Sequence, residues 1–132
     1  LIERRDPIGR TYLTKINPLF DFSMEASGTL RFQNAATNSG FASAPVGGYR
    51  ADFYLFDNGT GSSQPLGAAT GPQEEGLRMT AAVPAGAYFI KVAVSAVEPP
   101  YPSWTTPVEA YFRRSPEGWK LVGFERFPAP PP

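Results

Sequence analysis

Residues 49–56 read YRADFYLF, and this stretch indicates the fold class more clearly than any other part of the chain. In a β-strand, successive side chains point to opposite faces of the sheet. One face of the predicted strand carries Tyr49, Ala51, Phe53 and Leu55, and the other carries Arg50, Asp52, Tyr54 and Phe56. Both faces are apolar near the end of the stretch, which predicts a central strand of a sheet.

Short runs with the same two-residue period lie on both sides of this strand. They predict further strands at residues 10–16, 19–26, 29–33, 76–83, 87–94, 108–113 and 119–126. In the run at 19–26, the period places Phe20, Phe22 and Met24 on one face. Turn residues at 84–86 (PAG) and 115–118 (SPEG) predict two hairpins, the first of which pairs 76–83 with 87–94.

These patterns predict one all-β domain over residues 1–127. Its predicted architecture is an antiparallel β-sandwich of seven or eight strands, immunoglobulin-like or jelly-roll-like, and an open barrel is the alternative. The chain contains 13 glycines and 15 prolines, which interrupt it too often for long helices. Residues 34–48 are small and polar and predict a long loop, whereas the prolines of 128–132 predict an extended tail or linker.

The composition excludes several classes of chemistry. The chain has neither cysteine nor histidine, so disulfides, thiolate nucleophiles, histidine bases and histidine-ligated transition metals are all excluded, and we expect no cofactor. Lys and Arg total 12 and Asp and Glu total 12, which gives a net charge of zero. A neutral chain has no long-range field that attracts nucleic acid, so we expect no nucleic-acid partner. No apolar run approaches the ~20 residues of a transmembrane helix.

Two hairpins carry local resemblances. VPAGAYFIKV at 83–92 resembles a hairpin of bacterial extracytoplasmic β-sandwich domains, and VEAYFRRSPEGWKLVGF at 108–124 resembles the terminal hairpin of NTF2-like proteins. Each covers under a fifth of the 132 residues, and the breakers within 1–48 do not suit the long helices of the NTF2-like family. Neither resemblance assigns a family. The first resemblance, with a start at Leu1, favours a module of a larger exported bacterial protein, periplasmic or secreted.

Acidic residues supply two candidate sites. Asp52 and Glu109 lie mid-strand and are the best pair for carboxylate catalysis on carbohydrate, which needs two acids about 5 to 9.5 Å apart. Each also has a simpler interpretation as a solvated residue with an arginine as cross-strand partner. Asp57, Asn58 and Thr60 group oxygens in one loop and are weak calcium candidates. A β-turn explains the same residues without a metal, and we favour it.

The predicted hairpin at 108–126 mixes aromatic and basic residues. The group comprises Tyr111, Phe112, Arg113, Arg114, Trp119 and Lys120. Such mixing occurs in proteins that bind single-stranded nucleic acid, but the zero net charge argues against that function here. We interpret Phe112 and Trp119 as packing partners and the cations as residues at the rim.

Residues 98–107 read EPPYPSWTTP, and their four prolines make a stiff connection. Its two aromatic residues, Tyr101 and Trp104, either form a platform that binds a ligand or close the end of the hydrophobic core. We favour a plug, in which Trp104 is buried and Tyr101 faces outward. If the segment binds a ligand instead, these two residues are the candidate binding residues.

The sequence favours a non-catalytic domain that binds a ligand or gives structural support through its end loops. An unknown protein or a carbohydrate is the expected partner, and a carboxylate-dependent enzyme acting on carbohydrate is the alternative. A pocket that encloses two carboxylates would favour the enzyme, and a surface with an exposed aromatic ring would favour the binding domain.

Overall fold

The computed structural model describes residues 18–25, 28–40, 42–57, 59–73, 76–79, 83, 88–116 and 118–126. Eight antiparallel strands form a single sheet in the order β4-β3-β6-β7-β8-β1-β2-β5. The strands are β1 (Leu19–Met24), β2 (Thr29–Asn34), β3 (Tyr49–Phe56), β4 (Ser63–Gly71), β5 (Leu77–Arg78), β6 (Phe89–Ala96), β7 (Val108–Ser115) and β8 (Gly118–Arg126). A four-residue α-helix, α2 (Ala35–Asn38), and a 3-10 helix, η2 (Pro102–Thr105), complete the described elements.

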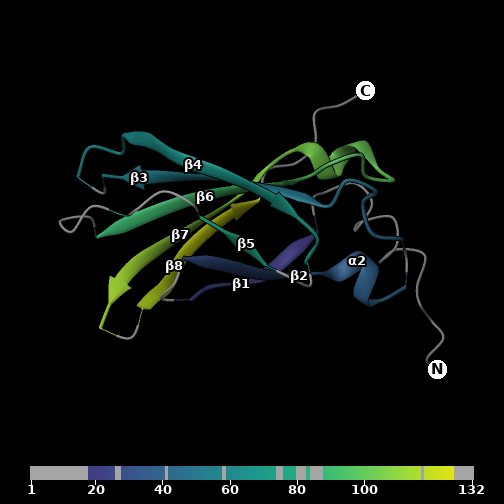
Figure 1. Ribbon diagram of the computed structural model, residues 1–132, viewed down its shortest axis with the longest axis horizontal. Helices are drawn as coiled ribbons and strands as arrows, with labels where there is room; N and C mark the ends of the chain where they lie inside the picture. Colours follow the sequence, from purple (N-terminus) through teal and green to yellow (C-terminus); the bar gives the residue numbers. More distant parts are fainter. Residues whose placement is uncertain are drawn as a thin grey trace.

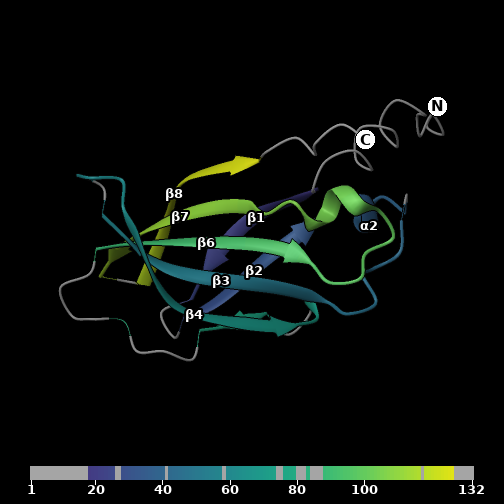
Figure 2. The ribbon, with the colours of Figure 1, turned by 90° about the horizontal axis from the view of Figure 1, so that it is seen from above.

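The sheet curls into a nearly closed barrel (Figures 1 and 2). The two end strands of the sheet, β4 and β5, approach each other. This approach is seen at Gly71 of β4, where a Cβ atom would lie 3.5 Å from Cδ2 of Leu77 in β5. The all-β class and the strand number are confirmed, whereas the predicted two-sheet sandwich is wrong and its barrel alternative is right. One register pair, Met24 with Trp119, joins β1 to β8 and so links two groups of strands that a sandwich would keep apart.

The core confirms the predicted alternation in the central strands. In β3, Tyr49, Ala51 and Phe53 are buried, although Leu55 is only half-buried. The next strands contribute one buried face each, made of Ile90, Val92, Val94 and Ala96 in β6 and Val108, Ala110 and Phe112 in β7. β3 has neighbours on both sides, β4 and β6, as the two apolar faces near its end predict.

An irregularity in β1 corrects the predicted face of that strand. The pairing of β1 with β2 shifts between Phe20 and Ser23, and Asp21 has a positive φ of 57°. This bulge changes which side chains point inward. Phe22 and Met24 are buried as predicted, but Leu19 is buried in place of Phe20, which remains 40% exposed.

Three further elements differ from the sequence predictions. The sequence does not predict β4, because its residues SQPLGAATG include few that favour strands. β4 can nevertheless contain Pro65, because it lies at the end of the sheet order, where proline is tolerated. The hairpin predicted around residues 84–86 is wrong, because its two strands, β5 and β6, do not pair with each other. β5 pairs with β2, whereas β6 pairs with β3 and β7. The predicted loop at 34–48 includes α2. The strand at 10–16, the turn at 84–86 and the tail at 128–132 lie outside the described residues.

The proline-rich segment at 98–107 closes one end of the barrel. η2 and α2 lie at this end, and the turn between β7 and β8 lies at the opposite end (Figures 1 and 2). Trp104 in η2 has no exposed surface, which confirms that it is buried. Tyr101 does not face fully outward as predicted, because it is half-buried against the core with its ring centroid 5.8 Å from that of Trp104.

Candidate functional site

A hollow of about 570 Å³ opens beside α2, and we call it the end hollow. Three separate parts of the chain form it: residues 37–38 of α2, residues 44–49 before and at the start of β3, and residues 71–73 at the end of β4. Its described lining residues are Thr37, Asn38, Ala44, Pro45, Val46, Gly47, Gly48, Tyr49, Gly71, Pro72 and Gln73. The hollow therefore depends on tertiary structure and has no sequence motif.

Glycines allow the backbone to come close in the wall of the end hollow. Gly48 has a φ of +77°, and a Cβ there would lie 2.6 Å from the carbonyl oxygen of Gly71. A Cβ on Gly47 would lie 2.5 Å from Cγ1 of Val97. The backbone N–H of Gly47 donates to the oxygen of Val97 and the N–H of Val97 donates to the oxygen of Gly48, both at 2.9 Å. These contacts fix residues 47–48 on the segment that begins the proline-rich connection.

Asn34 fixes α2, which forms the helical wall of the end hollow. The prediction of a loop at 34–48 gives this residue no such role. This buried residue is the N-cap of α2: its Oδ1 accepts from the backbone N–H groups of Ala36 at 2.9 Å and Thr37 at 3.1 Å. Its Nδ2 donates to the hydroxyl of Tyr49 at 2.8 Å. An asparagine directly after an alternating run and before two alanines is the signal that would have indicated a helix start.

The described lining of the end hollow is uncharged but can form hydrogen bonds. None of its described lining residues carries a charge at neutral pH, and the lining includes the side chains of Thr37, Asn38 and Gln73. Apolar surface comes from Ala44, Pro45, Val46 and Pro72. A charged ligand would lose hydration here without gaining an opposite charge, so the lining favours a neutral ligand.

The two carboxylates considered for catalysis lie elsewhere, on the outer face of the barrel. In the register, Asp52 and Glu109 both pair with Ala93, so one strand separates them. Arg50 Nη2 lies 2.9 Å from Asp52 Oδ1, and hydrogen bonding to Asp52 raises the pKa of Arg50. Glu109 accepts from the hydroxyl of Tyr111 at 3.1 Å. Neither acid is among the described lining residues of the end hollow.

Glu109 belongs to a polar and aromatic cluster that spans β3, β6 and β7. Lys91 Nζ lies 3.9 Å from Glu109 Oε2 and 4.9 Å from the ring centroid of Tyr54. The ring of Tyr111 contacts that of Phe56 edge-on, with centroids 5.0 Å apart. Lys91 and Glu109 thus form an ion pair between neighbouring strands on the outer face of the barrel.

The tyrosine of this cluster gives a prediction about pH. Burial raises the pKa of Tyr111 to about 12, and the charge of Glu109 and the hydrogen bond to it add to the shift. The pKa of an unfolded tyrosine is about 10. Because the folded state favours the protonated phenol, Tyr111 makes its full contribution to the free energy of unfolding below pH 10. This contribution is lost as the pH rises towards about 12. In urea melts between pH 10 and about 12, we expect Tyr111→Phe to lose less stability than the wild type. Equal losses in the two proteins would show that Tyr111 is not the group responsible.

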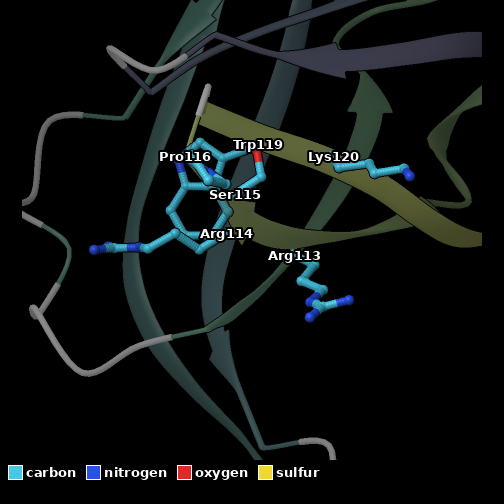
Figure 3. A pocket seen from close by; sticks show the side chains of 6 residues that line it. All are labelled: Arg113, Arg114, Ser115, Pro116, Trp119 and Lys120. Carbon is cyan, nitrogen blue, oxygen red and sulfur yellow. The ribbon is translucent and has the colours of Figure 1, made fainter.

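A second hollow, of about 610 Å³, lies at the β7–β8 turn, and we call it the hairpin hollow (Figure 3). Its described lining residues are Arg113, Arg114, Ser115, Pro116, Trp119 and Lys120. The predicted hairpin is confirmed, with Ser115 opposite Gly118. In the register, Phe112 lies opposite Leu121 and Trp119 lies opposite Arg114. Trp119 is half-buried against the core cluster that includes Phe112.

The loop proposed as a weak calcium site forms a hydrogen-bonded turn. Asp57 Oδ1 accepts from the backbone N–H of Gly59 at 2.8 Å and of Thr60 at 3.3 Å. Asn58 lies outside the described residues. Among the residues that the structure describes, no group of three or more acidic side chains is placed to hold a metal ion. The described contacts therefore fit the β-turn interpretation.

The two candidate binding residues of the proline-rich segment differ in accessibility. Trp104 is fully buried and so presents no surface to a ligand, whereas Tyr101 is half-buried and keeps part of its ring accessible.

No family model, curated protein or solved structure matches this chain. Within the described ranges, no helix is long and apolar enough to cross a membrane.

Proposed function

We propose that this chain is a non-catalytic binding domain of a larger exported bacterial protein, and that the end hollow binds a neutral, hydroxyl-rich ligand such as a sugar. The observation that carries the proposal is that the described lining of this hollow, about 570 Å³ in volume, is uncharged. The hollow lies between α2 and the segments 44–49 and 71–73. Because α2 lies at one end of the barrel (Figures 1 and 2), this position agrees with binding through end loops.

The lining matches the two kinds of surface that a sugar presents. The side chains of Thr37, Asn38 and Gln73 can donate to and accept from hydroxyl groups. Pro45 and Pro72 offer apolar surface for the C–H face of a sugar ring. Because Asn34 and the glycine contacts hold the walls, little ordering of the chain would be needed on binding.

The alternative, an enzyme that uses two carboxylates, needs a pocket that encloses both acids. The described linings of the end hollow and the hairpin hollow contain no carboxylate. Asp52 and Glu109 engage neighbouring cations or hydroxyl groups on the outer face of the barrel. We therefore propose binding rather than catalysis for the end hollow.

The test is a titration with neutral sugars, including glucose, mannose, galactose, xylose and N-acetylglucosamine, followed by amide NMR shifts. We expect at least one sugar to shift the amides of residues 37–38, 44–49 and 71–73. Gln73→Ala and Asn38→Ala should each weaken its binding about fivefold, the value of one hydrogen bond of ~1 kcal/mol.

Gln64→Ala is the matched control, because Gln64 is exposed and lies at the other end of β4 from Gln73. This variant should bind as the wild type does. Glucuronate should bind more weakly than glucose, since its carboxylate would lose hydration without meeting a cation among the described lining residues. No shifts from any sugar, or equal weakening by Gln64→Ala, would reject the proposal.

A further inference from the structure

The outer face of the β7–β8 hairpin places two like charges directly opposite each other. Arg113 in β7 pairs in register with Lys120 in β8, and both side chains are exposed. Directly opposite residues of an antiparallel pair have their Cβ atoms about 4.5–5.5 Å apart, so like charges there repel and destabilise the hairpin. Three other cations of the described chain instead lie beside carboxylates, in the pairs Arg31–Glu25, Arg50–Asp52 and Lys91–Glu109.

We propose that Arg113 and Lys120 bind a tetrahedral oxyanion, phosphate or sulfate, at the edge of the hairpin hollow. Neither side chain forms an ion pair with a carboxylate of the described residues. The hollow that both residues line, about 610 Å³, provides space for the ligand. This inference is independent of sugar binding, because the end hollow lies beside α2, and α2 lies at the opposite end of the barrel from the β7–β8 hairpin turn (Figures 1 and 2).

The charges and the donors determine the class of ligand. A doubly charged oxyanion balances the two cations, whereas a carboxylate balances only one of them. Arginine offers two parallel N–H groups to such an anion and lysine offers a mobile ammonium group. Arg114 extends away from both side chains, and its guanidinium lies 5.0 Å from the ring centroid of Trp119 (Figure 3). We therefore assign Arg114 to packing on Trp119 and not to the anion.

The test compares sodium sulfate and sodium phosphate with sodium chloride at equal ionic strength, by amide NMR shifts and thermal melts. Sulfate and phosphate should each shift the amides around Arg113 and Lys120 and raise the melting temperature, and chloride should do neither. Arg113→Gln and Lys120→Gln should each raise Kd at least tenfold. Arg78→Gln, which removes the same charge from an exposed position on β5, should leave Kd unchanged.

A charge reversal separates this site from general screening. Lys120→Glu would place a carboxylate opposite Arg113, so it should raise the melting temperature without added anion and abolish the response to sulfate. Glucose 6-phosphate tests whether the anion is carried on a sugar: tighter binding than phosphate would indicate a phosphorylated ligand, and equal binding would indicate the free anion. Equal effects of sulfate and chloride, or the same loss of binding in Arg78→Gln, would overturn the proposal.

Discussion

Trp104→Ala is expected to lower the free energy of unfolding by about 3–5 kcal/mol, the usual cost of removing a large buried aromatic side chain. Trp104 is fully buried in η2, between the end of β6 and the start of β7, and it is among the largest fully buried side chains. The prolines around it hold the connection in place, so the chain cannot readily collapse into the space that the indole leaves. Urea melts of the variant and the wild type measure the difference.

Tyr101→Ala is the matched control for this result. Tyr101 is half-buried and its ring packs on that of Trp104, so we expect a smaller cost of about 1–2 kcal/mol, which includes the ~0.5–1.5 kcal/mol of an aromatic pair. Because the two rings are in contact, the cost of the double variant should be less than the sum of the single costs. A loss below about 1 kcal/mol for Trp104→Ala would show that the indole does not close the core.

The strands that the sequence predicted best are those whose signal is local. β3, β6 and β7 alternate over most of their length, so their backbone and buried faces follow from neighbouring residues. β4 has no such signal, since its alanines and glycines are placed by pairing with β3 and not by their own preference. The bulge that turns Phe20 outward likewise depends on the pairing of β1 with β2.

The architecture and the candidate sites depend on contacts between distant residues. The choice between sandwich and barrel depends on how β1 joins β8, which local alternation cannot reveal because either architecture buries one face of each strand. The end hollow combines α2 with the start of β3 and the end of β4, which come from three separate parts of the sequence. At the hairpin, the sequence indicated a cluster of cations, but the register was needed to place Arg113 opposite Lys120.

Asn34→Ala is expected to cost about 2–4 kcal/mol, although asparagine in a predicted loop would ordinarily be replaceable. The change removes the N-cap of α2, worth about 1 kcal/mol, and also the buried hydrogen bond to Tyr49, whose loss costs ~1–3 kcal/mol. Asn38→Ala makes the same substitution at an exposed position four residues later and should change stability by less than about 0.5 kcal/mol.

A double-mutant cycle separates the two roles of Asn34. Tyr49→Phe removes only the hydroxyl of the Asn34–Tyr49 hydrogen bond, so its cost should be about 1–2 kcal/mol, less than that of Asn34→Ala. If the bond forms as described, the double variant should be more stable than the sum of the single costs predicts, by ~0.5–1.5 kcal/mol. Additive costs would show that the hydrogen bond contributes nothing, and that Asn34 acts through the helix cap alone. Because this residue fixes Thr37 beside the end hollow, Asn34→Ala should also weaken sugar binding under conditions in which the variant remains folded.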